Sequence, residues 1–167
     1  MSIGNTLVLG IGNRLLSDEG VGVHAVELLA REHPDLADIT CVDGGTLSFT
    51  LAEAIATHDN LIVVDAARFG GPPGAVRCFE GGAMSVYLSG TRKSAHEVGL
   101  VDLLDIARLS DTLPRRLALV GVEPGELGWG ERPSGPVSLA LPGVVREVLL
   151  ILGRWAGESD APASGGA

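Results

Sequence analysis

Four short apolar runs, separated by stretches with helical periodicity, constrain the fold of this chain most strongly. They cover residues 6–11, 39–43, 60–66 and 117–122, and most of them are rich in Val, Leu and Ile. Runs of this kind are typical of strands that are covered on both faces, as in a mostly parallel sheet. We therefore expect each run to form a buried strand.

A weaker fifth run covers residues 75–79. The preceding loop, residues 68–74, is rich in Gly and Pro and is too short to hold a crossover helix. Two strands joined by such a short loop are antiparallel. We therefore expect the fifth strand to run against its neighbours.

Helical patterns fill the other gaps. The first helix is expected to start near Val21, and the second to cover residues 49–56. A third begins after Ser94, and a fourth covers residues 138–155. Pro142 lies inside the fourth and predicts a kinked or later start. The order of elements predicts a three-layer α/β/α fold with a mixed, mostly parallel five-stranded sheet. We expect one domain over residues 1–155. Residues 156–167 are small and polar, which predicts a disordered tail.

The net charge and the cysteines of the chain indicate its class of partner and its cellular compartment. The chain has 167 residues and a formal net charge of −9, with no basic run, which disfavours nucleic acid and anionic membranes as partners. The two cysteines form no CxxC pair and are predicted to be free thiols, as in a reducing cytosol. We expect no apolar stretch of the ~20 residues that a membrane helix needs. A cytoplasmic protein is the resulting expectation.

The end of the first strand resembles a nucleotide-binding loop, but its residues argue against one. Gly10 and Gly12 fit the pattern G-x-G-x-x-G, whereas the third position is Leu15. Asp18 and Glu19 would place negative charge where a pyrophosphate has to bind. For these two acids the ordinary alternative is capping of the following helix.

Ligands of an open α/β sheet bind beyond the carboxyl ends of its parallel strands. Glu19, Asp43, Asp65 and Glu123 all lie at or near such ends. His96 follows Ser94, which forms an S-x-x-E capping box with Glu97, so His96 is expected in the first turn of a helix with a neutral ring.

Two carboxylates and an imidazole, from Glu19, Asp65 and His96, would suit a divalent first-row metal with open positions. The spacing alone is a weak signal. Asp65 is equally consistent with a cap on a loop amide. A His at a helix start is more often an ordinary surface residue, which is the alternative for His96.

Five segments in one order carry a resemblance to a known family. They read LVLGIGNRLLSDEGVGVHAVELL, VDGGT, LIVVDA, SAHEVGLVDLL and LALVGVEP. In this order they resemble the nickel-iron hydrogenase maturation endopeptidases over the whole chain except its tail. The resemblance implies a peptidase that removes a C-terminal extension from the nickel-loaded precursor of a hydrogenase large subunit.

The resemblance also implies roles for individual residues. Glu19, Asp65 and His96 fall on the nickel-recognition positions, and Asp43 falls on a further acidic position tied to activity. The nickel is expected to arrive with the precursor instead of being held permanently. Asp43 and Asp65 are the catalytic candidates, because without a Ser or Cys nucleophile the cleavage needs an activated water.

Two questions stay open at the level of sequence. The water is either bound to nickel, with Asp43 or Asp65 as base, or activated by carboxylates while nickel serves only for recognition. The rival function is a non-catalytic, nickel-sensing chaperone of the same precursor.

We also expect the loop 123–131, with Trp129, to contact the protein substrate.

Overall fold

The computed structural model describes residues 3–46, 49–90 and 95–159. Five strands and five α-helices follow one another in these ranges, with a short 3-10 helix, η1, after the first strand. The strands are β1 (Thr6–Ile11), β2 (Ile39–Gly45), β3 (Asn60–Ala66), β4 (Val76–Glu80) and β5 (Arg116–Val122). The helices are η1 (Ser17–Gly20), α1 (Val21–Glu32), α2 (Leu51–Ala56), α3 (Gly82–Leu88), α4 (Ala95–Leu109) and α5 (Gly135–Ser159).

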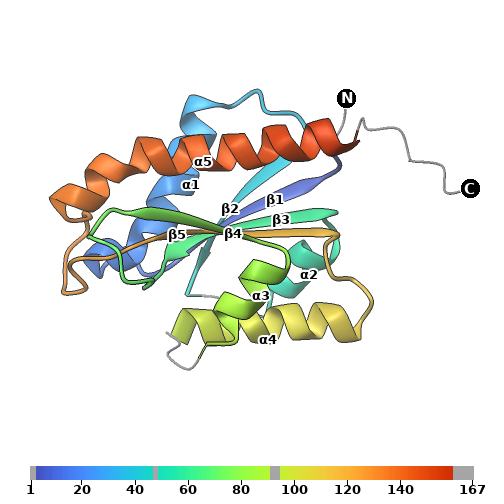
Figure 1. Ribbon diagram of the computed structural model, residues 1–167, viewed down its shortest axis with the longest axis horizontal. Coiled ribbons are helices and arrows are strands. Elements are labelled where there is room, and N and C mark those ends of the chain that lie inside the picture. The colour runs from blue at the N-terminus through green and yellow to red at the C-terminus, as the bar shows by residue number, and fades with distance from the viewer. Residues whose placement is uncertain (1–2, 47–48, 91–94, 160–167) are drawn as a thin grey trace, which may run out of the picture.

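The strands form one sheet in the order β2-β1-β3-β5-β4. The first four are parallel to one another, and β4 is antiparallel to β5. Helices α1 and α5 cover one face, and α2, α3 and α4 cover the other (Figure 1). The predicted three-layer α/β/α fold and the antiparallel fifth strand are therefore confirmed.

Each face of the sheet has its own hydrophobic core. Side chains alternate along a strand, so Val8 and Val64 pack with α1 and α5, whereas Leu9 and Val63 pack with the helices of the opposite face. Strand β1 is buried over its whole length. The apolar run of this strand is thus explained by helices on both sides.

One helix was missed, and both ends of another need correction. Helix α3, with Gly81 as its N-cap, was not predicted. Helix α5 begins earlier than expected, at Gly135, and continues through Pro142. It also extends to Ser159, so the first four residues of the expected tail, 156–159, are helical. Residues 160–167 of that tail lie outside the described residues.

Helix α5 also corrects the expectation that no segment is long and apolar enough to span a membrane. Within the described ranges one segment, Gly135–Glu158, meets that criterion by length and composition. Its side chains Val144, Val148 and Ile151 are buried in the core between α5 and the sheet. Burial against the sheet accounts for these three residues, whereas Leu139 and Leu150 on the same helix are exposed.

Candidate active site

The carboxyl ends of the four parallel strands lie at one end of the molecule, and helix α4 begins at that same end (Figure 1). This arrangement brings together segments that are far apart in the sequence. It is the position at which open α/β sheets bind their ligands.

Asp65 is a buried acidic residue at the carboxyl end of the sheet. It lies in β3, and only 2% of its surface is exposed. It has the same parity along the strand as Leu61 and Val63, which pack on the face covered by α4. Burial raises the pKa of Asp65 well above its ordinary value, and the charges of Glu97 and Glu19 raise it further, against a hydrogen bond from the backbone of Ala66. Negative charge from both glutamates thus disfavours the ionised form of Asp65.

Glu19 is brought to Asp65 by the turn after β1. A Cβ added at Gly12 would lie 1.8 Å from the carbonyl oxygen of Glu19, and Gly12 has a φ of +134°. A Cβ at Gly10 would lie 2.3 Å from the carbonyl oxygen of Gly22. The two glycines therefore allow η1 and α1 to pack directly on the strand ends. The G-x-G pattern at this turn serves protein packing and the placement of Glu19.

Glu97 was predicted only as part of a capping box, yet it lies inside the site. Its side chain is buried, and its carboxylate accepts a hydrogen bond of 2.9 Å from the hydroxyl of Tyr87. Tyr87 stacks on Phe79 of β4, with ring centroids 4.4 Å apart. Burial first, and the bond to Glu97 second, raise the pKa of Tyr87. The position of Glu97 next to His96 was a sequence signal that could have placed this acid at the site. Its partner Tyr87 could not be expected there, because helix α3, which carries Tyr87, was missed.

His96 lies in the first turn of α4, at the carboxyl end of the sheet, as its position in the sequence predicts. Ser94, the other half of the predicted capping box, lies outside the described residues, as does the side chain of His96. Among the side chains that are described, no group of three His, Cys, Asp or Glu residues forms a ready metal site. The charge of Glu19 acts on Asp65, and the metal site formed with His96 stays a prediction.

Asp43 is separated from Asp65 by the sheet itself. Gly10 of β1 lies between Asp43 of β2 and Val64 of β3 in the register. Asp43 therefore shares the face of Val64, which is the α1 and α5 face, and Asp65 lies on the opposite one. Asp43 is exposed and accepts a hydrogen bond of 2.9 Å from the backbone N–H of Gly45. The structure does not bring the two predicted catalytic carboxylates together.

Asp18, next to Glu19, has a different role from its neighbour. It is fully buried, and its carboxylate accepts hydrogen bonds from the N–H groups of Gly125, Glu126 and Ser134 and from the Ser134 hydroxyl, at 2.6 to 2.8 Å. These donors belong to the loop between β5 and α5. Asp18 thus fastens this loop to the segment that carries Glu19.

Glu123 fastens a second loop at the same end. It is buried, and its carboxylate accepts hydrogen bonds from the N–H groups of Phe69 and Gly71 at 2.8 and 3.4 Å. Those groups lie in the Gly/Pro-rich loop between β3 and β4. The Glu123 carboxylate therefore binds the backbone of another loop of the protein.

Comparisons with known proteins identify the family of this chain. A family model described as hydrogenase maturation protease matches residues 23–150, which include Asp43, Asp65 and His96. This chain belongs to the hydrogenase maturation protease family. The membership confirms the resemblance read from the five sequence segments.

Individual relatives of this chain carry names from the same family. The chain is 35% identical over 150 residues to the hydrogenase expression/formation protein HupD of Rhizobium leguminosarum bv. viciae, covering 89% of this chain and 74% of that protein. It is 37% identical over 124 residues to the hydrogenase 2 maturation protease of Escherichia coli K12, covering 72% and 74%. The solved structure of the hydrogenase maturating endopeptidase HybD from E. coli superposes with a TM-score of 0.81 at 30% identity, covering 90% and 93%. The enzyme is therefore an endopeptidase of hydrogenase maturation.

Proposed function

We propose that this endopeptidase removes a C-terminal extension from the precursor of a nickel-iron hydrogenase large subunit after nickel has been inserted. The observation that carries the proposal is the buried carboxylate of Asp65, which lies within the electrostatic influence of Glu19 and Glu97. Negative charges held together away from water are stabilised by a cation. In this proposal the cation is the nickel of the precursor.

The donor set fits a nickel ion that belongs to the substrate. Glu19 and Asp65 supply two carboxylates, and His96 lies at the start of α4 at the same end of the sheet. Carboxylate and imidazole donors suit divalent first-row metals, and a set of three leaves positions for the ligands that the precursor provides. An ion that already has ligands in the precursor can then be recognised without being removed.

We propose an aspartic type of chemistry, in which Asp65 takes the proton of the attacking water. The water oxygen bonds to the carbonyl carbon of the scissile peptide, the proton passes to the carboxylate, and the amine leaves with a proton as the C–N bond breaks. Asp65 has the position for this role, because it lies beside Glu19 where the nickel end of the precursor would bind. When bound, the nickel supplies positive charge that can polarise a nearby oxygen.

The test is a reaction between purified enzyme and precursor, with and without nickel, followed by mass measurement of the product. We expect loss of the extension only from the nickel-loaded precursor. His96→Ala should abolish this cleavage, whereas His33→Ala, at the end of α1 and remote from the site, should not. Binding of loaded precursor without any cleavage would support the nickel-sensing chaperone instead.

We also propose that the reaction takes place in the cytoplasm and that the partner is the precursor alone, without nucleic acid or membrane. The free thiols Cys41 and Cys78 and the net charge of −9 support this. Cell fractionation with an antibody to the protein is the direct measurement. Recovery of the enzyme in the membrane or periplasmic fraction would contradict this location.

A further inference from the structure

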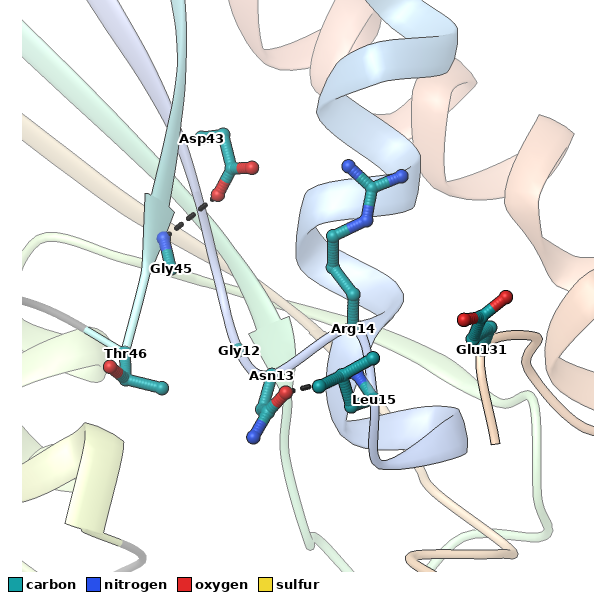
Figure 2. Close-up of a pocket in the computed structure, with 8 residues that line it drawn as sticks. All are labelled: Gly12, Asn13, Arg14, Leu15, Asp43, Gly45, Thr46 and Glu131. Carbon is teal, nitrogen blue, oxygen red and sulfur yellow. Dashed lines mark hydrogen bonds between the residues drawn. The ribbon is translucent and has the colours of Figure 1, made fainter. Parts of the chain in front are cut away.

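A cavity of about 510 Å³ lies beside the carboxyl end of β2. Its walls are the turn of residues 12–15, the end of β2 with Asp43 and Thr46, and Glu131 from the loop between β5 and α5 (Figure 2). The volume is within the roughly 300–1,000 Å³ of typical ligand clefts. Asp65 does not line it, so this cavity is separate from the carboxylates at the nickel-recognition end.

The cavity offers polar atoms that the protein itself does not use. Asp43 spends one carboxylate oxygen on the N–H of Gly45, and within the described ranges the second oxygen accepts no hydrogen bond (Figure 2). The amide oxygen of Asn13 accepts from the N–H of Leu15 at 2.9 Å, which fixes the amide orientation and leaves its NH₂ group as a donor. One wall therefore presents an acceptor and another presents a donor, and a peptide group needs both.

The backbone beside the cavity is also suited to an extended peptide. Strand β2 is at the edge of the sheet and pairs with β1 alone among the described strands. An exposed edge can take up an additional strand through main-chain hydrogen bonds. A chain lying along β2 would enter the cavity at Asp43 and Gly45.

Charge restricts the side chains that such a peptide can carry. Arg14 lines the cavity, but its guanidinium is paired with Glu27 of α1. Asp43 and Glu131 are then left as negative groups. An acidic side chain would be repelled here, whereas a neutral or basic one would not.

We propose that this cavity binds, in extended form, the segment of the precursor next to the cleaved bond, and that Asp43 is a substrate-binding residue and not the base. The inference rests on the proposed function. It follows from the opposite faces on which Asp43 and Asp65 lie. The turn that begins at Gly12 leads directly to Glu19, so a segment leaving the cavity over this turn reaches the nickel-recognition end.

Steady-state kinetics on nickel-loaded precursor separate binding from catalysis. Asp43→Asn keeps the oxygen that accepts from Gly45, so the turn is retained. We expect Asp43→Asn and Asn13→Ala each to raise KM about 10-fold, the loss of roughly one hydrogen bond, with kcat within about twofold of wild type. Asp35→Asn, an exposed carboxylate in the loop before β2, is the matched control and should change neither. A fall in kcat of about 100-fold or more in Asp43→Asn, at unchanged KM, would make Asp43 catalytic and overturn the proposal.

Photo-crosslinking provides a readout that does not require cleavage. A benzoylphenylalanine replaces Thr46 in the cavity or, as control, Asp35. We expect only the first to crosslink, and peptide mapping should place the bond in the C-terminal segment of the precursor. A crosslink elsewhere in the precursor, or none, would contradict the cavity assignment. Failure of the wild-type enzyme to cleave would instead remove the proposed function, and the crosslink would still decide whether the segment binds here.

Discussion

Asp18 accepts two hydrogen bonds from Ser134, one from its backbone N–H at 2.6 Å and one from its hydroxyl at 2.8 Å. The two residues are 116 positions apart, and Glu19 directly follows Asp18. The anchor of the loop between β5 and α5 and the carboxylate proposed to recognise nickel are therefore consecutive residues. A displacement of this loop would therefore shift the segment that carries Glu19.

Asp18→Asn should lower the free energy of unfolding by about 2–4 kcal/mol, because an amide NH₂ replaces one of two buried acceptor oxygens that face N–H and O–H donors. Urea denaturation measures the change, with Asp35→Asn as the exposed control. Burial raises the pKa of Asp18, but its hydrogen bonds outweigh burial and the net pKa is lowered. The contribution of Asp18 is therefore present above the unfolded-state pKa near 3.8 and is lost as the pH falls through the lower folded value. Equal stability of Asp18→Asn and wild type at pH 7 would contradict this role.

Gly12→Ala should impair both folding and processing. The added Cβ meets the Glu19 carbonyl at 1.8 Å, and a φ of +134° is unfavourable for alanine. We expect a loss of about 2 kcal/mol or more in unfolding free energy, and a greater loss of cleavage than instability alone produces, because Glu19 has to move. Gly82→Ala, at the start of α3 with open space around it, is the control and should be neutral or slightly stabilising. Similar behaviour of the two variants would count against the packing explanation.

Asp65→Asn should make the free enzyme more stable at neutral pH while abolishing its activity. The folded-state pKa of Asp65 is raised, so the charged form weakens the fold as the pH rises above the unfolded-state value near 3.8. A neutral amide removes that repulsion with Glu97 and Glu19. We expect a higher melting temperature at pH 7, together with a fall in cleavage of about 100-fold or more. A stabilised variant that still cleaves normally would exclude Asp65 as the base.

Trp129→Ala should weaken binding of the precursor without slowing the chemical step. Trp129 is 85% exposed on the loop that Asp18 anchors, close to the segment of Glu19. An exposed aromatic side chain held on an ordered loop is suited to a protein interface. We expect Kd to rise roughly 10-fold, about 1.4 kcal/mol, at unchanged kcat. Leu139→Ala, also 85% exposed but on α5, should have no effect.

Fluorescence gives an independent view of the same contact. The only other tryptophan, Trp155, is 3% exposed in the core, so quenching by acrylamide reports mainly on Trp129. Bound precursor should protect Trp129 from the quencher, with the Trp129→Phe enzyme as the blank. Unchanged quenching at saturating precursor would show that the loop is not in the interface.

The strands and their directions could be predicted because they depend on local pattern. The runs at residues 6–11 and 60–66 match β1 and β3, and the short Gly/Pro loop set the antiparallel direction of β4. Acidic residues at the strand ends pointed to the carboxyl end of the sheet, where the structure places Asp65 and the start of α4. Helix α3 was missed because it is only 7 residues long and begins at a glycine, with a second glycine as its N-cap.

What the sequence determined by itself was therefore the layered fold and the end of the sheet at which its acidic residues gather. Only the tertiary structure decided the surroundings of each acid there: Asp18 binds a distant loop, Asp65 is buried and acted on by the charge of Glu19, and Asp43 lies on the other face. The physical reason is that hydrophobic periodicity is a property of neighbouring residues. The direction of a strand-end side chain instead depends on the register between strands and on partners more than a hundred residues away.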